Sequence, residues 1–168
     1  MSLWLCLRFE LLPLEALLTQ QGQPDDTAVI IATQRRVLIL ICDERASLCG
    51  VLPEQSISTA QALLVDTQHC VLERSRETEE ALLEQLSIWA YGLSPHLQRW
   101  RDDALMIEIG GCLRLHRGLD ALLAHIDIEM RFRGLTIAIG IAETRHAAWL
   151  LSHTDRGIAC QPERPLND

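Results

Sequence analysis

Cysteine and histidine are the side chains of this sequence that could bind a metal or act as nucleophiles, and both types are scattered. The six cysteines lie mostly inside apolar runs, and none forms a Cys-x-x-Cys pair. They are Cys6, Cys42, Cys49, Cys70, Cys112 and Cys160. The six histidines are equally dispersed. Because zinc sites need ligands at short coordinating spacings, we expect no metal site and no cofactor. Such thiols are typical of reduced core residues in a cytoplasmic protein.

The charge of the chain limits its partners. The formal net charge is −8, which opposes nucleic acid because Lys and Arg contacts to phosphate supply most non-specific affinity. The arginines are interleaved with acids and have no aromatic stacking platform beside them. We therefore expect weak or no autonomous DNA binding. The first apolar segment, residues 3–9, is too short to span a bilayer and has no secretory-signal pattern, so we expect no membrane association.

Hydrophobic periodicity predicts an α/β chain with alternating strands and helices. Helix starts are indicated by Pro13 and by the capping residues Asp43, Ser56 and Ser75. The predicted strands are residues 3–9, 28–32, 37–41, 70–72, 95–100, 104–109 and 135–141. The predicted longer helices are residues 75–91, 118–132 and 143–151. This order favours one mixed sheet with helices mainly on one face. Residues 154–168 are polar, contain two prolines and are expected to form a tail.

Three motifs follow one another along this pattern and carry a family resemblance. Arg8-Phe9-Glu10 ends the first strand, residues 43–51 follow a predicted hairpin, and residues 101–108 open a central strand. Their order and spacing resemble the palm and inserted fingers of a Y-family DNA polymerase of the UmuC/DinB type. The resemblance implies a palm-like domain over residues 1–153, a fingers-like insertion at about residues 33–72, and no thumb or little-finger domain.

Polymerases of this family clamp two divalent ions between carboxylates, so that the attacking and leaving oxygens are stabilised together. By the resemblance, the first family aspartate falls at Arg8, and Glu10 takes the second acidic position. In the central strand Asp103 is retained, whereas the neighbouring glutamate is replaced by Ala104. Because a guanidinium repels metal ions, we expect no normal two-metal site.

The register of the central strand leaves one alternative. With Asp103-Ala104 on the family's Asp-Glu pair, Glu108 stands at the later acidic position. Shifting by one residue would place Asp102-Asp103 there, but it would put Ile107 at the later acid and turn every side chain to the other face. We therefore prefer the first register.

The positions that contact the nucleotide triphosphate in the family are also changed. The fingers tyrosine and arginine of the family fall at Glu44 and Ser47. Side chains that donate hydrogen bonds to phosphate are thus replaced by a carboxylate and a short hydroxyl. Arg145 keeps a positive charge where the family has a lysine. We expect no catalytic or nucleotide-binding residues of the usual kind.

Within the family, the sequence most resembles the ImuB subgroup. Its signature includes Leu-Glu-Ala-Leu at residues 14–17, Gly-Gly-Cys-Leu-Arg-Leu at 110–115 and Arg-His-Ala-Ala-Trp-Leu-Leu at 145–151. The resemblance implies a non-catalytic accessory protein, not an enzyme, in DNA repair, SOS-associated translesion synthesis and induced mutagenesis. Implied partners are an error-prone polymerase, a RecA-like protein and the sliding clamp.

Two alternatives remain. A weakly active polymerase fragment would require Asp103 and Glu10 to hold metal. An unrelated α/β binding domain or a non-functional remnant would require a fold without the strand order of the palm.

Overall fold

The computed structural model describes residues 2–22, 27–33 and 38–154, and within them the chain divides into two units. The outer unit is formed by the described residues of 1–10 and 83–168, and the inserted unit by those of 11–82. Residues 34–36 of the connection expected between two strands, Val37 at the start of the strand predicted at 37–41, and the tail from residue 155 lie outside the described residues.

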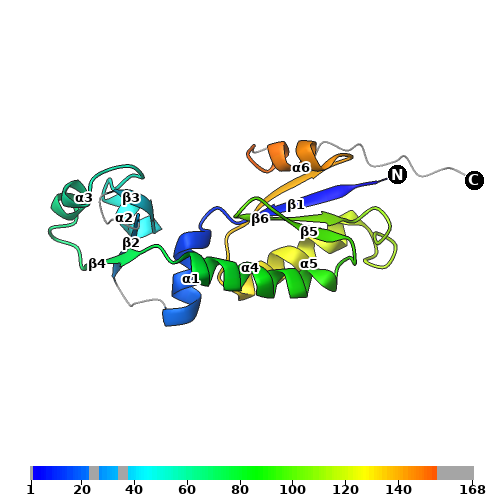
Figure 1. Ribbon diagram of the computed structural model, residues 1–168, viewed down its shortest axis with the longest axis horizontal. Helices are drawn as coiled ribbons and strands as arrows, with labels where there is room; N and C mark the ends of the chain where they lie inside the picture. The colour runs from blue at the N-terminus through cyan, green and yellow to red at the C-terminus, as the bar shows by residue number, and fades with distance from the viewer. Residues whose placement is uncertain (1, 23–26, 34–37, 155–168) are drawn as a thin grey trace, which may run out of the picture. The chain divides into compact units, whose positions relative to one another are not determined.

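The outer unit contains a four-stranded antiparallel sheet in the order β5-β6-β1-β7. Its elements are β1 (Trp4–Arg8), the later part of α4 (Arg76–Tyr91), β5 (Leu97–Trp100), β6 (Ala104–Glu108), α5 (Leu119–Phe132), β7 (Ala138–Ala142) and α6 (Arg145–Leu151). Figure 1 shows α6 on one side of this sheet and α5 on the other. The central position of β1 explains why its residues Leu5, Cys6 and Leu7 are fully buried.

Side-chain alternation assigns the residues of β1 to the two faces. Cys6 belongs to a cluster with Met106 and Ala148, on the face covered by α6. Leu5 and Leu7 point to the opposite face. Arg8, two residues beyond Cys6, therefore shares the α6 face.

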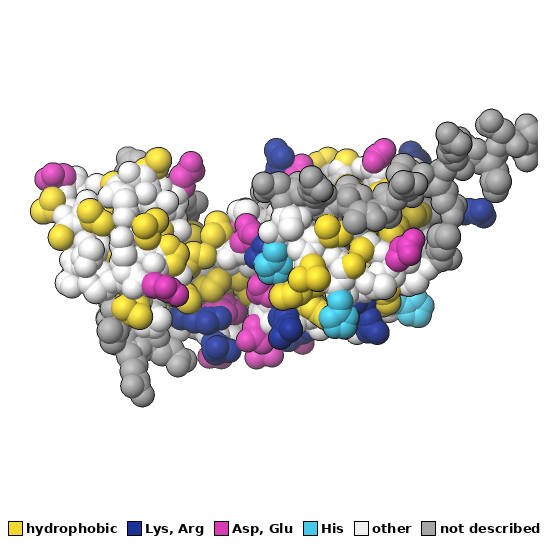
Figure 2. Space-filling model, turned by 90° about the horizontal axis from the view of Figure 1, so that it is seen from above, with side chains coloured by type: hydrophobic (Ala, Val, Ile, Leu, Met, Phe, Trp, Pro, Cys, Tyr) yellow, Lys and Arg dark blue, Asp and Glu magenta, His cyan; other side chains and the backbone are white. Residues whose placement is uncertain are grey.

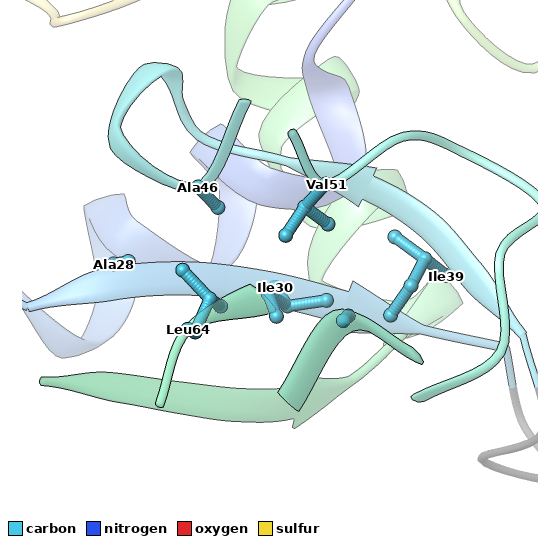
Figure 3. Close-up of a cluster of buried hydrophobic side chains, with 7 residues drawn as sticks. Ala28, Ile30, Ile39, Ala46, Val51 and Leu64 are labelled. Carbon is cyan, nitrogen blue, oxygen red and sulfur yellow. The ribbon is translucent and has the colours of Figure 1, made fainter. Parts of the chain in front are cut away.

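The inserted unit contains a three-stranded sheet in the order β3-β2-β4, in which β2 pairs antiparallel to β3 and parallel to β4. Its elements are α1 (Leu12–Gln21), β2 (Ala28–Ala32), β3 (Ile39–Cys42), α2 (Glu44–Leu48), α3 (Ile57–Leu63), β4 (His69–Glu73) and the start of α4. One face of β2 packs with α1 through Leu14, Leu17, Val29 and Ile31. The other face packs with α2 and α3 around Ile30 (Figure 3).

The α/β class predicted from the sequence is confirmed. The strands, however, form two separate sheets instead of one mixed sheet, and α6 covers the face of the outer sheet opposite α5. The inserted unit also runs from Leu11 to Leu82, so it includes α1 and β2, which the expected insertion at 33–72 left out. No helix among the described residues is both long and apolar enough to cross a membrane.

Candidate functional site

The end of β1 carries Arg8, the most unusual residue of the predicted site. In the sheet register Arg8 lies opposite Ala104 on β6 and Ala138 on β7. Its guanidinium donates a hydrogen bond of 2.9 Å to the carbonyl of Ser152 at the end of α6. It also forms an ion pair with the carboxylate of Glu10. The Arg8 side chain is 13% exposed, so the positive charge is held close to the sheet end.

Asp103 lies next to this arginine because the β5–β6 turn is joined to the end of β1. The Asp103 carbonyl accepts a hydrogen bond of 2.8 Å from the Phe9 backbone N–H. The side chain is half-buried, and burial raises the pKa of Asp103 against the opposing attraction of Arg8 and His153. The structure thus brings Arg8, Glu10 and Asp103 to one end of the sheet.

The close approach of α6 fixes Ser152 at this end. A methyl group on Gly140 of β7 would overlap the Ala148 carbonyl oxygen and lie 2.5 Å from the Ser152 nitrogen. Only glycine therefore lets the helix lie this near to the strand. The Cys6 thiol donates a weak hydrogen bond of 3.8 Å to Ser152 Oγ, and burial raises the pKa of Cys6 to about 11. The thiol is thus protonated at neutral pH and is not a nucleophile.

Glu108 lies away from this group. It ends β6 opposite Trp4, at the far end of β1 from Arg8. Its carboxylate accepts hydrogen bonds from the backbone N–H groups of Leu3 and Gly110, at 3.2 and 3.1 Å. Glu108 therefore holds a turn rather than joining Asp103.

Arg145 begins α6 and also makes its contacts near the start of β1. Thr144 caps the helix by accepting from the Ala147 N–H at 3.3 Å. The Arg145 guanidinium donates to Gln98 at 3.0 Å and lies over the Trp4 ring, 5.1 Å from its centroid. The described contacts of Arg145 do not join it to Arg8 or Asp103.

Glu44 and Ser47, the remaining predicted positions, lie on α2 of the inserted unit, and both are exposed. Ser152, Gly140 and Cys6 were not predicted as site residues. Gly140 inside a strand pattern was the one sequence signal for them, since glycine there often marks a close backbone approach.

The family resemblance implies a pair of divalent ions, which would need several carboxylate oxygens at one place. At the three matched positions the chain offers one half-buried carboxylate, Asp103, a methyl group, Ala104, and the guanidinium of Arg8. Within residues 2–22, 27–33 and 38–154, no three His, Cys, Asp or Glu side chains gather closely enough to hold a metal ion. These residues do not fit a two-ion site of the usual composition.

Comparisons with known proteins identify a matching family and solved structures of similar fold. The model of the impB/mucB/samB family matches residues 16–153. An insertion ternary complex of Dbh DNA polymerase is 10% identical with a TM-score of 0.72, covering 96% of this chain and 49% of that one. The crystal structure of DinB from Sulfolobus solfataricus is 10% identical with a TM-score of 0.67, covering 93% of this chain and 47% of that one. The chain thus spans about half the length of these solved chains, and no curated protein sequence matches it.

These likenesses confirm the Y-family polymerase-like fold that the motif order predicted. They contradict the expectation that the chain is not an enzyme, because the solved chains of this fold are DNA polymerases. Degenerate motifs alone were insufficient for that interpretation, since substitutions at single ligand positions do not identify the protein class.

Proposed function

Because the chain belongs to the impB/mucB/samB family, we propose that it forms the palm and fingers of a Y-family DNA polymerase that acts in translesion synthesis, the copying of damaged DNA. The proposed reaction is template-directed nucleotidyl transfer. The proposal gives the protein a role in DNA repair, carried out in the cytoplasm on chromosomal DNA.

The observation that carries this proposal is the convergence of Arg8, Glu10 and Asp103 at the end of β1. This is where the family resemblance puts the reacting groups, and the β1–β6 register supports it by pairing Arg8 with Ala104. Asp103 supplies a half-buried carboxylate, and Arg8 offsets the negative charge of Glu10. Because these residues do not fit the usual pair of ions, we expect slow transfer and assign no step to a metal.

Primer extension on a labelled primer–template, with magnesium or manganese, tests the proposal. The natural chain should extend the primer slowly. The double variant Arg8→Asp with Ala104→Glu restores two carboxylates and should raise the rate by about tenfold or more. A matched control, Arg114→Asp with Ala121→Glu, makes the same charge change at exposed positions and should leave the rate unchanged. The proposal fails if neither the natural chain nor the folded double variant extends the primer.

An accessory role is the second candidate, and the Arg8–Glu10 ion pair favours it because it occupies the place of the carboxylates. In this role the chain would resemble the ImuB subgroup and would work in SOS-associated mutagenesis with an error-prone polymerase, a RecA-like protein and the sliding clamp. Affinity capture of the tagged natural protein from DNA-damaged cells, followed by mass spectrometry, tests this. Recovery of those three proteins supports the role, and their absence from an intact bait contradicts it.

A further inference from the structure

The segment from the end of α2 to just beyond α3, in the inserted unit, carries exposed apolar side chains. Residues 46–65 contain a single charged residue, Glu54, although 23% of the whole chain is charged. Four large apolar side chains of the segment face solvent: Leu48 is 81% exposed, Val65 77%, Leu52 55% and Leu63 43%. Figure 2 shows several hydrophobic side chains on the surface of this unit. Large apolar patches of this kind mark interaction sites more often than chance exposure does.

The four side chains, here named the α2–α3 surface, come from adjacent backbone. A methyl group on Gly50 would lie 4.0 Å from Leu63 Cδ1, so the segment after Leu48 runs beside the end of α3. The Cys49 thiol lies 3.7 Å from Thr67 Oγ1, which joins the segments after the two helices a second time. The Gln55 side chain accepts from the Leu52 N–H at 3.0 Å and donates to the Gly50 carbonyl at 3.4 Å. The two stretches of chain that carry the α2–α3 surface, residues 48–52 and 63–67, therefore lie side by side.

The patch lies on a fixed base. Asp43 caps α2 by accepting from the Ala46 N–H at 2.9 Å, and Ser56 caps α3 by accepting from the Thr59 N–H at 3.1 Å. Beneath the patch Ala46, Val51 and Leu64 belong to the core cluster around Ile30, shown in Figure 3. A partner would meet a preformed surface and would not have to order it, which favours binding.

The charged residues near the α2–α3 surface indicate which kind of partner could bind there. Residues 43–66 include four acids, Asp43, Glu44, Glu54 and Asp66, and one base, Arg45. Nucleic acid would be repelled by this acidic edge. A second copy of the chain would also meet like charge, since the chain carries a net charge of −8.

We propose that the α2–α3 surface is the docking site for an amphipathic helix of a partner protein, with an apolar stripe that covers Leu48, Leu52, Leu63 and Val65 and with flanking Arg or Lys residues that meet the acidic edge. This inference goes beyond the proposed polymerase function and does not depend on the residues at the end of β1.

Photo-crosslinking in the cells that make the protein identifies the occupant. A photoreactive amino acid at position 48 should crosslink to one protein segment, and sequencing of the joined peptide should find apolar residues at helical spacing flanked by Arg or Lys. The same group at the exposed position 128 of the outer unit is the control and should not give that product. Crosslinking to nucleic acid or to a second copy, or no crosslinking, overturns the proposal.

Two synthetic helical peptides with the same leucine stripe, one flanked by Lys and the other by Glu, then test the recognition in solution. The Lys-flanked peptide should bind about tenfold more tightly or better, and the variant Leu48→Ser with Leu63→Ser should weaken its binding by a similar factor. The matched control, Ile88→Ser with Ile128→Ser, removes side chains that are 69% and 65% exposed elsewhere and should change nothing. Equal affinity for both peptides, or equal weakening by both variants, overturns the proposal. All four substituted positions are exposed, so each variant should extend a primer at the rate of the natural chain. Primer extension therefore distinguishes a failure of the docking proposal from a failure of the proposed polymerase function.

Discussion

Two regions of the chain, the end of β1 in the outer unit and the α2–α3 surface in the inserted unit, treat charge and apolar surface in opposite ways. The outer unit holds the Arg8 guanidinium and the Asp103 carboxyl half or more buried at the end of its sheet. The α2–α3 surface exposes Leu48 and Val65 in a segment, residues 46–65, whose single charged residue is Glu54. Burying charge and exposing large apolar side chains both cost stability unless another group compensates.

In the outer unit the cost of burying the Arg8 charge is offset by contacts within the same unit. Arg8 is neutralised by Glu10 and bonded to the Ser152 carbonyl, so the charge is matched within the unit. In the inserted unit the apolar surface has no cover among the described residues of that unit. The first region thus satisfies its charges by contacts within the outer unit, whereas the second leaves its apolar side chains exposed for the partner that we propose.

Replacing Gly140 by alanine should have the largest effect, because it pushes α6 away from β7 and breaks the internal compensation at Ser152. The added methyl meets backbone atoms, which cannot rotate aside as a side chain can. We expect a loss of about 4 kcal/mol of unfolding free energy, above the usual range for overpacking. Chemical denaturation measures it.

Gly111→Ala is the matched control for this prediction. A methyl group there would lie 3.8 Å from a Glu108 carboxylate oxygen, an ordinary contact, so the unfolding free energy should hardly change. Equal stability of the two variants would mean that α6 does not depend on the close approach at Gly140.

Replacing Arg74 by alanine tests whether the inserted unit also depends on a matched buried charge. Arg74 donates two hydrogen bonds of 2.7 Å to the Glu79 carboxylate, and the Glu79 side chain is only 6% exposed. The variant would leave that carboxylate buried without the ion pair and should cost about 3 kcal/mol of unfolding free energy. The exposed pair Arg131–Asp127 serves as comparison, and Arg131→Ala should cost about 0.5 kcal/mol or less in the same denaturation experiment. A result for Arg74→Ala as small as that would show that the inserted unit does not rely on the pair.

Much of the fold follows from local signals in the sequence. The capping residues Asp43 and Ser56 are at the predicted helix starts, and the strand predicted at 28–32 matches β2. These features depend on a few neighbouring residues, because a cap or an apolar run acts within one turn or one strand. The final helix begins at Arg145 instead of residue 143, since Thr144 takes the cap position.

The parts that the sequence could not supply depend on contacts between distant residues. Arg8 and Ser152 form a hydrogen bond although they are 144 residues apart in the sequence. No local pattern could predict this contact between the end of a strand and the end of a helix. The division into two sheets has the same origin, since strand pairing is decided by long-range packing. Glu108 illustrates the limit of motif alignment: it matches an acidic position in sequence, but the direction of β6 carries it to the other end of β1.

The smallest predicted effect concerns the Cys6 thiol, which lies beneath the Arg8–Ser152 contact and should respond to alkaline pH. Burial raises the pKa of Cys6 from 9.0 to about 11. Between these values the unfolded chain releases the thiol proton while the folded chain keeps it, so stability is present below pH 9 and is lost as the pH rises toward 11. We expect a loss of about 2 kcal/mol from this group, measured by denaturation at a series of pH values.

The sequence simplifies this measurement, because the chain has no lysine, whose ammonium group would otherwise lose its proton in the same pH range. Burial also raises the pKa of Cys42 and Cys70, in the inserted unit, so part of the alkaline loss belongs to them. Cys6→Ala should flatten the pH dependence by the share of Cys6 and should leave the share of Cys42 and Cys70 in place. If Cys6→Ala retains the full dependence, the outer unit admits water to Cys6, and the α6 face is less tightly closed than its contacts with Ser152 indicate.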